Sequence, residues 1–404
     1  MNYLENAEKI EQDIIKDRRT LHQTAELGFD LENTCAYVKK RLDEMGVQYR
    51  EVADSGIVAQ IGNGNECFLL RADMDALPIN EEYRADFKSK NGNMHACGHD
   101  AHTAMLLGAA KLLKNNESQI TGCVKLLFQP AEEILEGAKR MIENGVLDDP
   151  TVGAAAMLHV IVGTELESGS VIVSSGGISA PAADYFKISL KGKGAHGSTP
   201  EKAKDPISVG VRIAMAIDAI KSRELALSER AVISLGIFKA GNAPNVIPDT
   251  AVLQGSMRAY SQSTRRYIKE RIVDIAVTEA ELFGVKAEVV FPCGCPALEN
   301  SHPVSAYVQK RASELLPSGY VTTSNILTAQ AETKGVSSAG AGSEDFAYIA
   351  QRVPSVMVGL CAGKASDGYV YPLHHPQFSL DESALKYGAA LLAEIAEKWQ
   401  NDLI

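Results

Sequence analysis

The chain has 404 residues, of which 45% are apolar and 23% are charged, as is usual for a globular protein. This length suggests roughly two or three domains. The formal net charge of -11, without any long Lys/Arg run, argues against a protein that binds nucleic acid or an anionic membrane surface. No apolar stretch reaches the ~18 residues that a transmembrane helix needs, so we expect no membrane span.

The compartment is also predicted from composition. Residues 1–19 are charged throughout and lack the apolar run of a secretory signal peptide. The seven cysteines are an odd number spread along the chain, whereas secreted disulfide frameworks use an even and denser set. We therefore expect a cytoplasmic protein.

Over the first 180 residues, short apolar runs alternate with helical patterns. The runs that predict strands are apolar throughout, which is typical of strands covered on both faces. The predicted elements are a strand at 67–73, a helix at 100–114, a strand at 122–129, a helix at 131–145 and a strand at 152–160. This order predicts an α/β fold: a mixed, largely parallel sheet with helices on both faces.

Residues 181–295 have a different order of elements. The strands and helices predicted there follow the order β-α-β-β-α-β, which is that of a ferredoxin-like α+β domain. They are a strand at 185–192, a helix at 205–222, strands at 231–241 and 250–260, a helix at 263–284 and a strand at 285–293. Because the α/β pattern resumes afterwards, we expect this domain to be inserted into a larger one made of residues 1–180 and 296–404.

The predicted elements of 296–404 are two helices at 303–316 and 343–351, a strand at 354–363 and a long helix from about 381. Ser379 and Glu382 fit a capping box at the start of this last helix.

The sequence MHACGHDAH carries three histidines and a cysteine. In an extended loop, residues two apart point to the same side, so Cys97 and His99 could bind one ion or a close pair of ions. The other interpretation is structural. Cys97 would then be a small buried apolar residue, and His95, His99 and His102 would line the start of a helix with Asp100 as its N-cap. Taken alone, the segment favours the structural interpretation.

Further metal-capable side chains follow other predicted strands. Glu132 and Glu133 come just after a strand, where open α/β sheets place ligands. Adjacent helical residues point to different faces, so one glutamate could bind metal while the other transfers a proton. By themselves they could be acidic residues in the first turn of a helix, and His159 could be a core histidine. With the loop that carries His374 and His375, four loops of the predicted α/β domain present side chains that can bind metal. This combination favours a two-metal hydrolytic centre.

Six motifs then resemble one known family. They are RADMDALP (71–78), MHACGHDAHTAMLLGAA (94–110), FQPAEE (128–133), KGKGAHGSTPEKAKDP (191–206), GNAPNVIPDTAVLQGSMRAY (241–260) and AGSEDFAY (341–348). From about residue 13 to 397 the chain resembles the dimetal amidohydrolase branch of the aminoacylase and carboxypeptidase metallopeptidases. That branch contains hippurate hydrolases, plant indole-acetyl-amino-acid hydrolases and bacterial N-acetyl-diaminopimelate deacetylases. The resemblance implies a catalytic domain with an inserted lid domain.

Matched position by position, the resemblance implies two divalent metal ions per subunit (Zn, Mn, Ni or Co), held by Cys97, His99, Glu133, His159 and His374. Relatives keep the first histidine of the His-His-Pro segment, which favours His374 over His375.

Four further positions in the catalytic domain can be matched. Glu132 matches the general base, which accepts a proton from metal-activated water and returns it to the departing amine. Asp75 matches the catalytic-site aspartate that supports the metals. Asp73 stands where more distant relatives have a metal-binding histidine, so its role stays open. Ala25 stands where relatives commonly have Pro, which we expect to affect local stiffness more than chemistry.

The resemblance also implies roles for lid residues. His196 matches a catalytic histidine that helps to hold the oxyanion, often in the site of the neighbouring subunit. Asn245 and Arg258 match residues that contact the substrate carboxylate, for which a guanidinium group is well suited. From the sequence alone, His196 could also be a solvated loop residue and Arg258 a surface residue. A homodimer formed through the lid domain is expected, because such a domain exposes a sheet edge that can pair.

The sequence therefore predicts an amidohydrolase that cleaves N-acyl amino acids, with N-acetyl or aromatic acyl groups, to a carboxylate and a free amino acid. The alternative is a dipeptidase or carboxypeptidase of the same superfamily. That branch usually joins its two metals through an aspartate, whereas this chain has Cys-Gly-His. A non-enzymatic metal-binding relative is disfavoured, because Glu132 and all the matched ligands are present.

Overall fold

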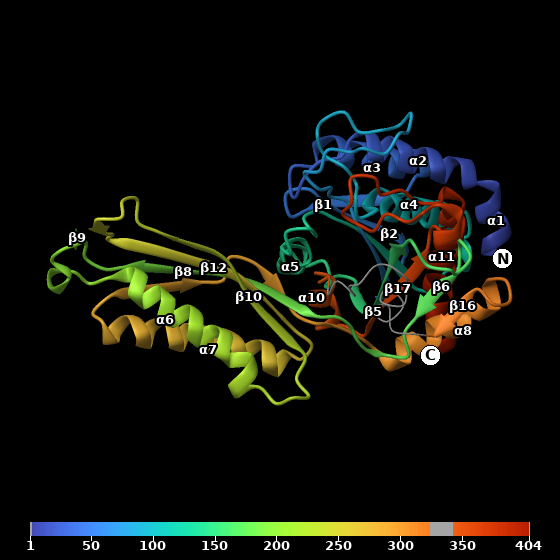
Figure 1. Ribbon diagram of the computed structural model, residues 1–404. Helices are drawn as coiled ribbons and strands as arrows, with labels where there is room; N and C mark the ends of the chain where they lie inside the picture. The colour runs from blue at the N-terminus through green and yellow to red at the C-terminus, as the bar shows by residue number, and fades with distance from the viewer. Residues whose placement is uncertain (1, 324–341, 404) are drawn as a thin grey trace. The chain divides into compact units, whose positions relative to one another are not determined.

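The computed structural model describes residues 2–323 and 342–403, which divide into two compact units (Figure 1). The first unit contains the chain up to Ser179 and most of it from Leu298 onwards. The second contains Ala180–Ala297 together with residues 342–344. Within the described ranges, no helix is both long enough and apolar enough to cross a membrane.

The strands in and next to the first unit are β1 (Gln48–Val52), β2 (Gly56–Gly62), β3 (Glu66–Asp73), β4 (Cys123–Gln129), β5 (Thr151–Ile161), β6 (Val171–Val173), β7 (Gly177–Ala180), β15 (Leu298–Asn300), β16 (Val321–Thr323) and β17 (Ser355–Cys361). Eight of them form one sheet in the order β1-β2-β4-β3-β5-β17-β6-β16. The central strands β4, β3, β5 and β17 are parallel, and antiparallel pairs flank them. The mixed, largely parallel sheet predicted from the sequence is confirmed.

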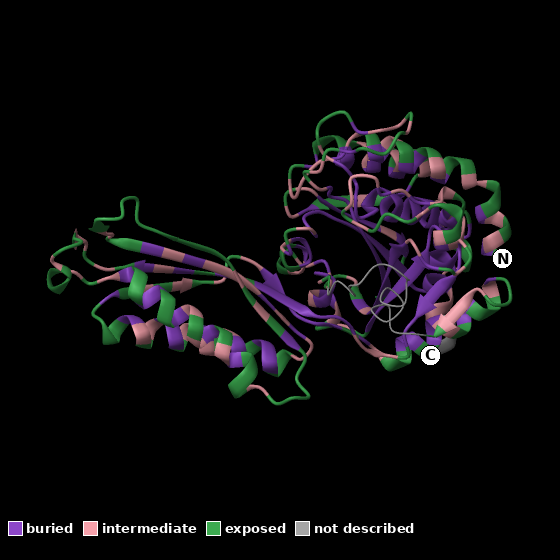
Figure 2. Cartoon of the chain, in the orientation of Figure 1, coloured by how far each residue is buried: buried purple, intermediate pink, exposed green. Residues whose placement is uncertain are grey.

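The helices of the first unit are α1 (Tyr3–Lys9), α2 (Glu11–Gln23), α3 (Glu32–Met45), α4 (His99–Asn115), α5 (Gly137–Glu143), α8 (His302–Leu315), α10 (Ala347–Ala350) and α11 (Leu385–Leu403). Helices α4 and α11 pack against each other and against β3. Successive strand residues point to opposite faces, so Phe68 and Leu70 enter this helix-covered core while Arg71 faces the other side. The residues of the central strands are buried, apart from Glu66, Thr151 and Gly153 near the strand starts (Figure 2).

The helix predicted at 131–145 is wrong in its first half, because α5 begins only at Gly137. Ala131 and Leu135 have φ angles of 57° and 59°, which an α-helix does not allow. A Cβ atom at Gly137 would lie 1.7 Å from the carbonyl oxygen of Pro130, so the chain folds back on itself here. The segment after β4 is consequently a series of tight turns.

The start of the last helix also differs from the prediction. A 3₁₀ turn at Glu382–Ala384 precedes α11, which begins at Leu385. Asp381 caps this turn by accepting a hydrogen bond from the Ser383 backbone N–H at 3.0 Å, so Ser379 is not the cap.

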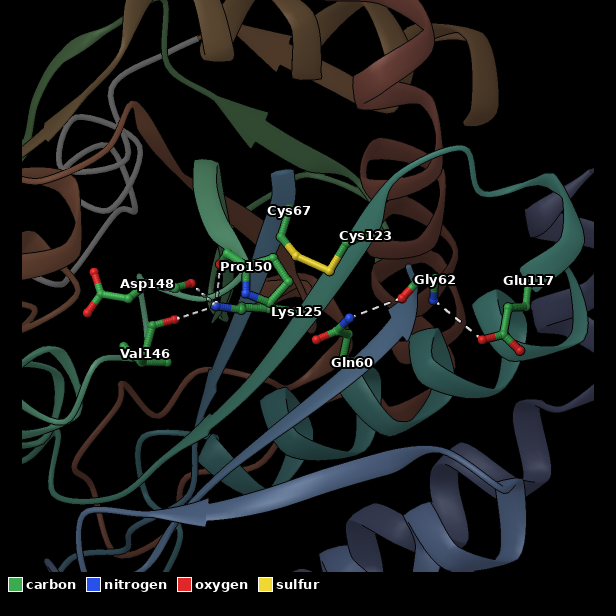
Figure 3. The surroundings of a disulfide bond; sticks show 9 residues. All are labelled: Gln60, Gly62, Cys67, Glu117, Cys123, Lys125, Val146, Asp148 and Pro150. Carbon is green, nitrogen blue, oxygen red and sulfur yellow. Dashed lines mark hydrogen bonds between the residues drawn. A yellow bond between two sulfur atoms is a disulfide. The ribbon is translucent and has the colours of Figure 1, made fainter. Parts of the chain in front are cut away.

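A disulfide ties together the beginnings of two strands that lead to the candidate site. Cys67 and Cys123 lie opposite each other on the parallel strands β3 and β4, and both are buried (Figure 3). Two residues further along β4, the buried Lys125 ammonium donates to three backbone carbonyls, those of Val146 (3.0 Å), Asp148 (2.6 Å) and Pro150 (2.6 Å). These contacts fix β3, β4 and the loop before β5 at the end of the sheet from which they start.

The second unit contains β8 (Ala182–Lys191), β9 (Ala195–His196), α6 (Pro206–Ala219), β10 (Ala231–Ala240), β11 (Val246–Ile247), β12 (Thr250–Ala259), α7 (Gln262–Leu282), β13 (Lys286–Val290) and β14 (Gly294–Cys295). Its main sheet is antiparallel, in the order β10-β12-β8-β13, and α6 and α7 pack side by side on it. The order β-α-β-β-α-β is the one predicted from the sequence.

Candidate active site and metal centre

The site forms where the central parallel strands end, as expected for an open α/β sheet. The residues that meet there come from four places in the first unit: the end of β3, the loop leading into α4, the turns after β4 and the end of β5. A loop before α11 adds a fifth. Those residues are Asp73 and Asp75, Cys97 and His99, Glu132 and Glu133, His159, and His374.

Gly98 explains why the loop before α4 can approach β5 so closely. Its φ angle is 87°, and a Cβ atom there would lie 2.4 Å from Val160 Cγ2. Any other residue would be both strained and in collision with β5. The close approach leaves Cys97 Sγ 3.6 Å from His159 Nε2.

Asp75 holds the two glutamates of the FQPAEE motif in place. Its carboxylate accepts hydrogen bonds from the backbone N–H groups of Glu132 at 3.0 Å and Glu133 at 3.1 Å. Asp75 is 1% exposed, so both bonds are shielded from water. The structure thus brings Asp75 under the glutamate pair, where it fixes their backbone.

Two groups of candidate metal-ligating side chains share the sulfur atom of Cys97. Three side-chain donor atoms lie within 4.8 Å of one another in each group: Cys97 with His99 and His159, and Cys97 with Glu133 and His374. His374 Nε2 is 3.3 Å from Cys97 Sγ and 3.6 Å from Glu133 Oε1. The structure therefore brings together the five residues expected to be ligands.

The hydrogen bonding of this cluster fits cation binding. His99 Nδ1 lies 2.8 Å from the Asp75 carbonyl oxygen, which leaves Nε2 facing the cluster. Within the described part of the chain, His99 Nε2 and Glu133 Oε1 are buried without a hydrogen-bond partner. An unsatisfied buried polar atom costs about 1–3 kcal/mol, and a metal ion would remove that cost at both atoms.

Burial also sets the protonation of the donors. It lowers the pKa of His159 to about 3 and lowers that of His374, so both imidazoles are neutral and can offer a lone pair. Burial raises the pKa of Glu133 to about 7 and, together with the Glu133 charge, raises the pKa of the Cys97 thiol. Burial lowers the pKa of His99, but the neighbouring Asp73 carboxylate outweighs this effect and holds that pKa above its ordinary value. Cation binding would therefore release protons from His99, Cys97 and Glu133.

Asp73 and His102 lie next to the cluster, but hydrogen bonds occupy both carboxylate oxygens of Asp73 and both ring nitrogens of His102. The two Asp73 oxygens pair with His102 Nδ1 at 2.6 Å and Arg71 Nη1 at 2.6 Å. His102 Nε2 accepts a hydrogen bond from the Val160 N–H at 3.0 Å. In the structure, the Asp73 carboxylate thus pairs with two neighbouring side chains.

Some residues around the site were not predicted. Asp100 was expected to cap α4, but the helix begins at His99, and the buried Asp100 carboxylate instead pairs with Arg18 at 2.7 Å and His22 at 2.8 Å. Asp345, in the AGSEDFAY motif, accepts from Arg71 Nη2 at 2.8 Å. Both aspartates stand in motifs that the sequence singles out, so the signal was present without indicating a partner.

The residues predicted in the lid lie in the second unit, at two different places. His196 is exposed on β9, which pairs with β11, and the Gly197 N–H donates to the Asn245 carbonyl oxygen at 2.8 Å, so His196 and Asn245 are neighbours. They adjoin the Thr250 end of β12. Arg258 is eight residues further along β12, which corresponds to about 27 Å of strand. Within one copy of this unit, Arg258 and the pair His196–Asn245 therefore do not meet.

The sequence matches a known family over most of its length. The sequence model described as peptidase family M20/M25/M40 matches residues 69–398. The N-acetyl-L-cysteine deacetylase of Bacillus subtilis (strain 168) is 36% identical, with 97% of this chain and 89% of the relative covered. The Arabidopsis thaliana IAA-amino acid hydrolase ILR1-like 5 is 36% identical, with 95% and 86% covered. Thermostable carboxypeptidase 2 of Saccharolobus solfataricus is also 36% identical, with 98% of both chains covered.

Solved structures give the same result for the fold. An aminohydrolase from methicillin resistant Staphylococcus aureus superposes with a TM-score of 0.87 at 33% identity, covering 99% of this chain and all of the other. The Bacillus subtilis YXEP protein, described as a dinuclear metal binding peptidase, superposes with a TM-score of 0.75 at 30% identity, covering 96% and 99%.

Proposed function

The chain belongs to peptidase family M20/M25/M40, and from that premise we propose that it is a metal-dependent amidohydrolase of N-acyl amino acids. It would cleave their amide bond to give a carboxylate and a free amino acid. The observation that carries this proposal is the cluster of five donors around Cys97, with Glu132 adjacent to one of them. Support for the substrate class comes from relatives named as a deacetylase of an N-acetyl amino acid and as a hydrolase of amino acid conjugates.

We propose that each subunit holds two divalent ions (Zn, Mn, Ni or Co), the first through Cys97, His99 and His159 and the second through Cys97, Glu133 and His374. Such ions, when bound, lower the pKa of a water molecule and polarise an amide carbonyl. His99 Nε2 and Glu133 Oε1, which lack a hydrogen-bond partner among the described residues, support this assignment.

Glu132 is the proposed proton carrier. Its backbone is fixed by Asp75, and it is 6% exposed, so its carboxylate is largely shielded from bulk water. In this role it takes a proton from the attacking water and delivers it to the amide nitrogen as the C–N bond breaks, so that a neutral amine leaves.

The two glutamates can be separated by experiment. Glu132→Gln is expected to keep both ions while kcat falls by about 10²–10⁴-fold, because only the proton carrier is lost. Glu133→Gln is expected to weaken ion binding in addition to lowering kcat. Ion content by elemental analysis and steady-state kinetics distinguish the two variants, and the reverse pattern would exchange the roles.

The lid residues support a site shared between two subunits. His196 is proposed to hold the oxyanion, and Asn245 and Arg258 to bind the substrate carboxylate. Within one copy of the second unit, about 27 Å of strand separates Arg258 from His196 and Asn245. We therefore propose that His196 and Asn245 reach the site from a partner copy.

A surface of the second unit suits such a homodimer. Strand β10 is an edge strand, with Val232, Ile237 and Phe238 between 36% and 51% exposed. Helix α6 packs against β10 and exposes Ile207, Val211 and Met215, which are four residues apart and so share one face. A second copy that pairs along β10 would cover both apolar surfaces.

Mixing inactive protomers tests this arrangement. If His196 acts in the partner's site, a dimer of one Glu132→Gln and one His196→Ala protomer regains one intact site and measurable activity. If each subunit uses its own His196, the mixture stays inactive. A fully active monomer in sedimentation experiments would reject the shared site.

The second candidate function is that of a carboxypeptidase or dipeptidase, which the relative named thermostable carboxypeptidase 2 supports. The deciding experiment uses metal-stripped enzyme reconstituted with Zn or Mn and offered N-acetyl amino acids, N-benzoyl amino acids and dipeptides. Preference for the acyl amino acids supports the proposal, and preference for dipeptides supports the alternative. Full activity in protein shown to be free of metal would refute both.

We also infer a cytoplasmic location from the small and odd number of cysteines. The Cys67–Cys123 disulfide offers the test, because such bonds rarely persist in a reducing compartment. Alkylation during cell lysis should find both thiols reduced; a fully oxidised pair would argue for an oxidising compartment.

A further inference from the structure

His102 lies on α4, one turn after His99, and both of its ring nitrogens are engaged. Its Nε2 atom faces the Val160 N–H at 3.0 Å, and because a backbone N–H can only donate, Nε2 must accept. The proton of the neutral ring is therefore on Nδ1, which donates to Asp73 Oδ1 at 2.6 Å. With no lone pair left, His102 cannot be a metal ligand.

The Val160 N–H needs this partner because of the sheet pairing. Strand β3 pairs with β5 only as far as Arg71 opposite Met157, so the end of β5 has no β3 neighbour. His102 takes the place of the missing strand at Val160. Its ring is also in edge contact with the His159 ring, with the centroids 4.7 Å apart.

The backbone carbonyl of Val160 determines how His159 faces the cluster. His159 Nδ1 lies 2.8 Å from the Val160 carbonyl oxygen, so this nitrogen carries the proton and donates. The Nε2 lone pair is thereby directed toward Cys97 Sγ, 3.6 Å away. A shift of Val160 would change both the tautomer and the direction of His159.

The other end of this chain of hydrogen bonds is anchored by buried charges. Asp73 also accepts from Arg71 Nη1 at 2.6 Å, and Arg71 Nη2 donates to Asp345 at 2.8 Å. All of these side chains are at most 2% exposed. These contacts hold the His102 ring in place, and with it the Val160 backbone to which the ring is hydrogen-bonded.

We propose that His102 is a positioning residue that, through Val160, fixes the tautomer and orientation of His159 for one of the two ions. The inference rests on the proposed function, since it assumes that His159 is a ligand. It concerns only the group Cys97–His99–His159, so the group that contains Glu133 and His374 should not depend on His102.

Two substitutions separate the two hydrogen bonds of His102. In His102→Gln the amide oxygen can stand near the Nε2 position and accept from the Val160 N–H. In His102→Asn the shorter amide can stand near the Nδ1 position and donate to Asp73, but it does not reach Val160. Thr103→Val is the matched control, because Thr103 is buried on the same helix and donates to the Asp73 carbonyl at 2.8 Å.

The experiment titrates each metal-stripped protein with Co²⁺ and follows binding by calorimetry and by the Co²⁺ absorption spectrum. Wild type, Thr103→Val and His102→Gln are expected to bind two ions. His102→Asn is expected to bind one ion normally and the other about 10- to 100-fold more weakly, the usual cost of losing an outer contact to a metal ligand.

Two-ion binding by His102→Asn with wild-type affinity would overturn the inference. Equal weakening by Thr103→Val would do so too, because the effect would then be general destabilisation. If His102→Asn does not fold, a His102→Gln protein that loses one ion overturns the inference and one that keeps both supports it. Wild-type protein that binds no Co²⁺ would instead refute the proposed function itself.

Discussion

Replacing Asp75 by asparagine tests how the glutamate pair is held. The Asp75 carboxylate accepts from the backbone N–H groups of Glu132 and Glu133 at 3.0 and 3.1 Å, and it is 1% exposed. An asparagine has one acceptor oxygen, so its NH₂ group would face one of these N–H groups. Losing a charge-assisted bond and leaving a buried N–H unpaired should lower the free energy of unfolding by about 3 kcal/mol.

The catalytic effect of Asp75→Asn should be larger than the stability effect suggests. A displacement of a reacting group by 1 Å can cost about 10²-fold in rate, so kcat should fall by about that factor through the loosened Glu132. Denaturant unfolding and steady-state kinetics measure the two effects. Asp54→Asn is the control, because Asp54 has a side chain that is 63% exposed. An Asp75→Asn enzyme with unchanged kcat and stability would refute the reasoning.

Three further variants probe the framework. Gly98→Ala places a Cβ atom 2.4 Å from Val160 Cγ2 at a φ angle of 87°, so ion affinity measured by calorimetry should fall, and unchanged affinity would contradict this account. In purified protein with the disulfide intact, replacing Cys67 and Cys123 together by alanine should lower the free energy of unfolding by about 4 kcal/mol, given the separation of 56 residues, with kcat unchanged. Lys125→Met leaves three carbonyls without their cation and should cost about 2–4 kcal/mol in denaturant unfolding, whereas a neutral result would show that water replaces the ammonium.

The architecture was predictable because its signals are local and repeated. Apolar strands alternating with helices indicated the largely parallel sheet, and the order β-α-β-β-α-β indicated the inserted unit. The helix prediction for 131–145 was wrong in its first half, because tertiary contacts hold that segment in tight turns despite its helical sequence pattern. The Asp75 carboxylate binds two successive backbone N–H groups there, and Gly137 packs against the Pro130 carbonyl. Neither contact has a signature in the segment itself.

The candidate site was predictable in residue type but not in connectivity. Three histidines in MHACGHDAH offer the same chemistry, and spacing alone does not say which of them has a free lone pair. The structure leaves His99 Nε2 without a hydrogen-bond partner among the described residues and gives His102 two partners. Both ring nitrogens of His95 also lack such a partner, but His95 belongs to neither donor group, and burial lowers its pKa to about 3. Such differences depend on residues brought in from other strands, so they need the fold.

Hydrogen-bond saturation separates the residues around this site into two kinds. Every oxygen of Asp73 and both carboxylate oxygens of Asp75 have a donor, so these aspartates hold structure in place. His99 and the partly buried Glu133 each keep one buried atom with no hydrogen-bond partner among the described residues. Burial penalises such atoms by about 1–3 kcal/mol each, a cost that a bound divalent ion would remove. The same cost falls on both ring nitrogens of His95, which also lack a hydrogen-bond partner but lie in neither donor group. An unpaired atom therefore indicates a ligand only where other candidate ligand atoms lie within 4.8 Å of it.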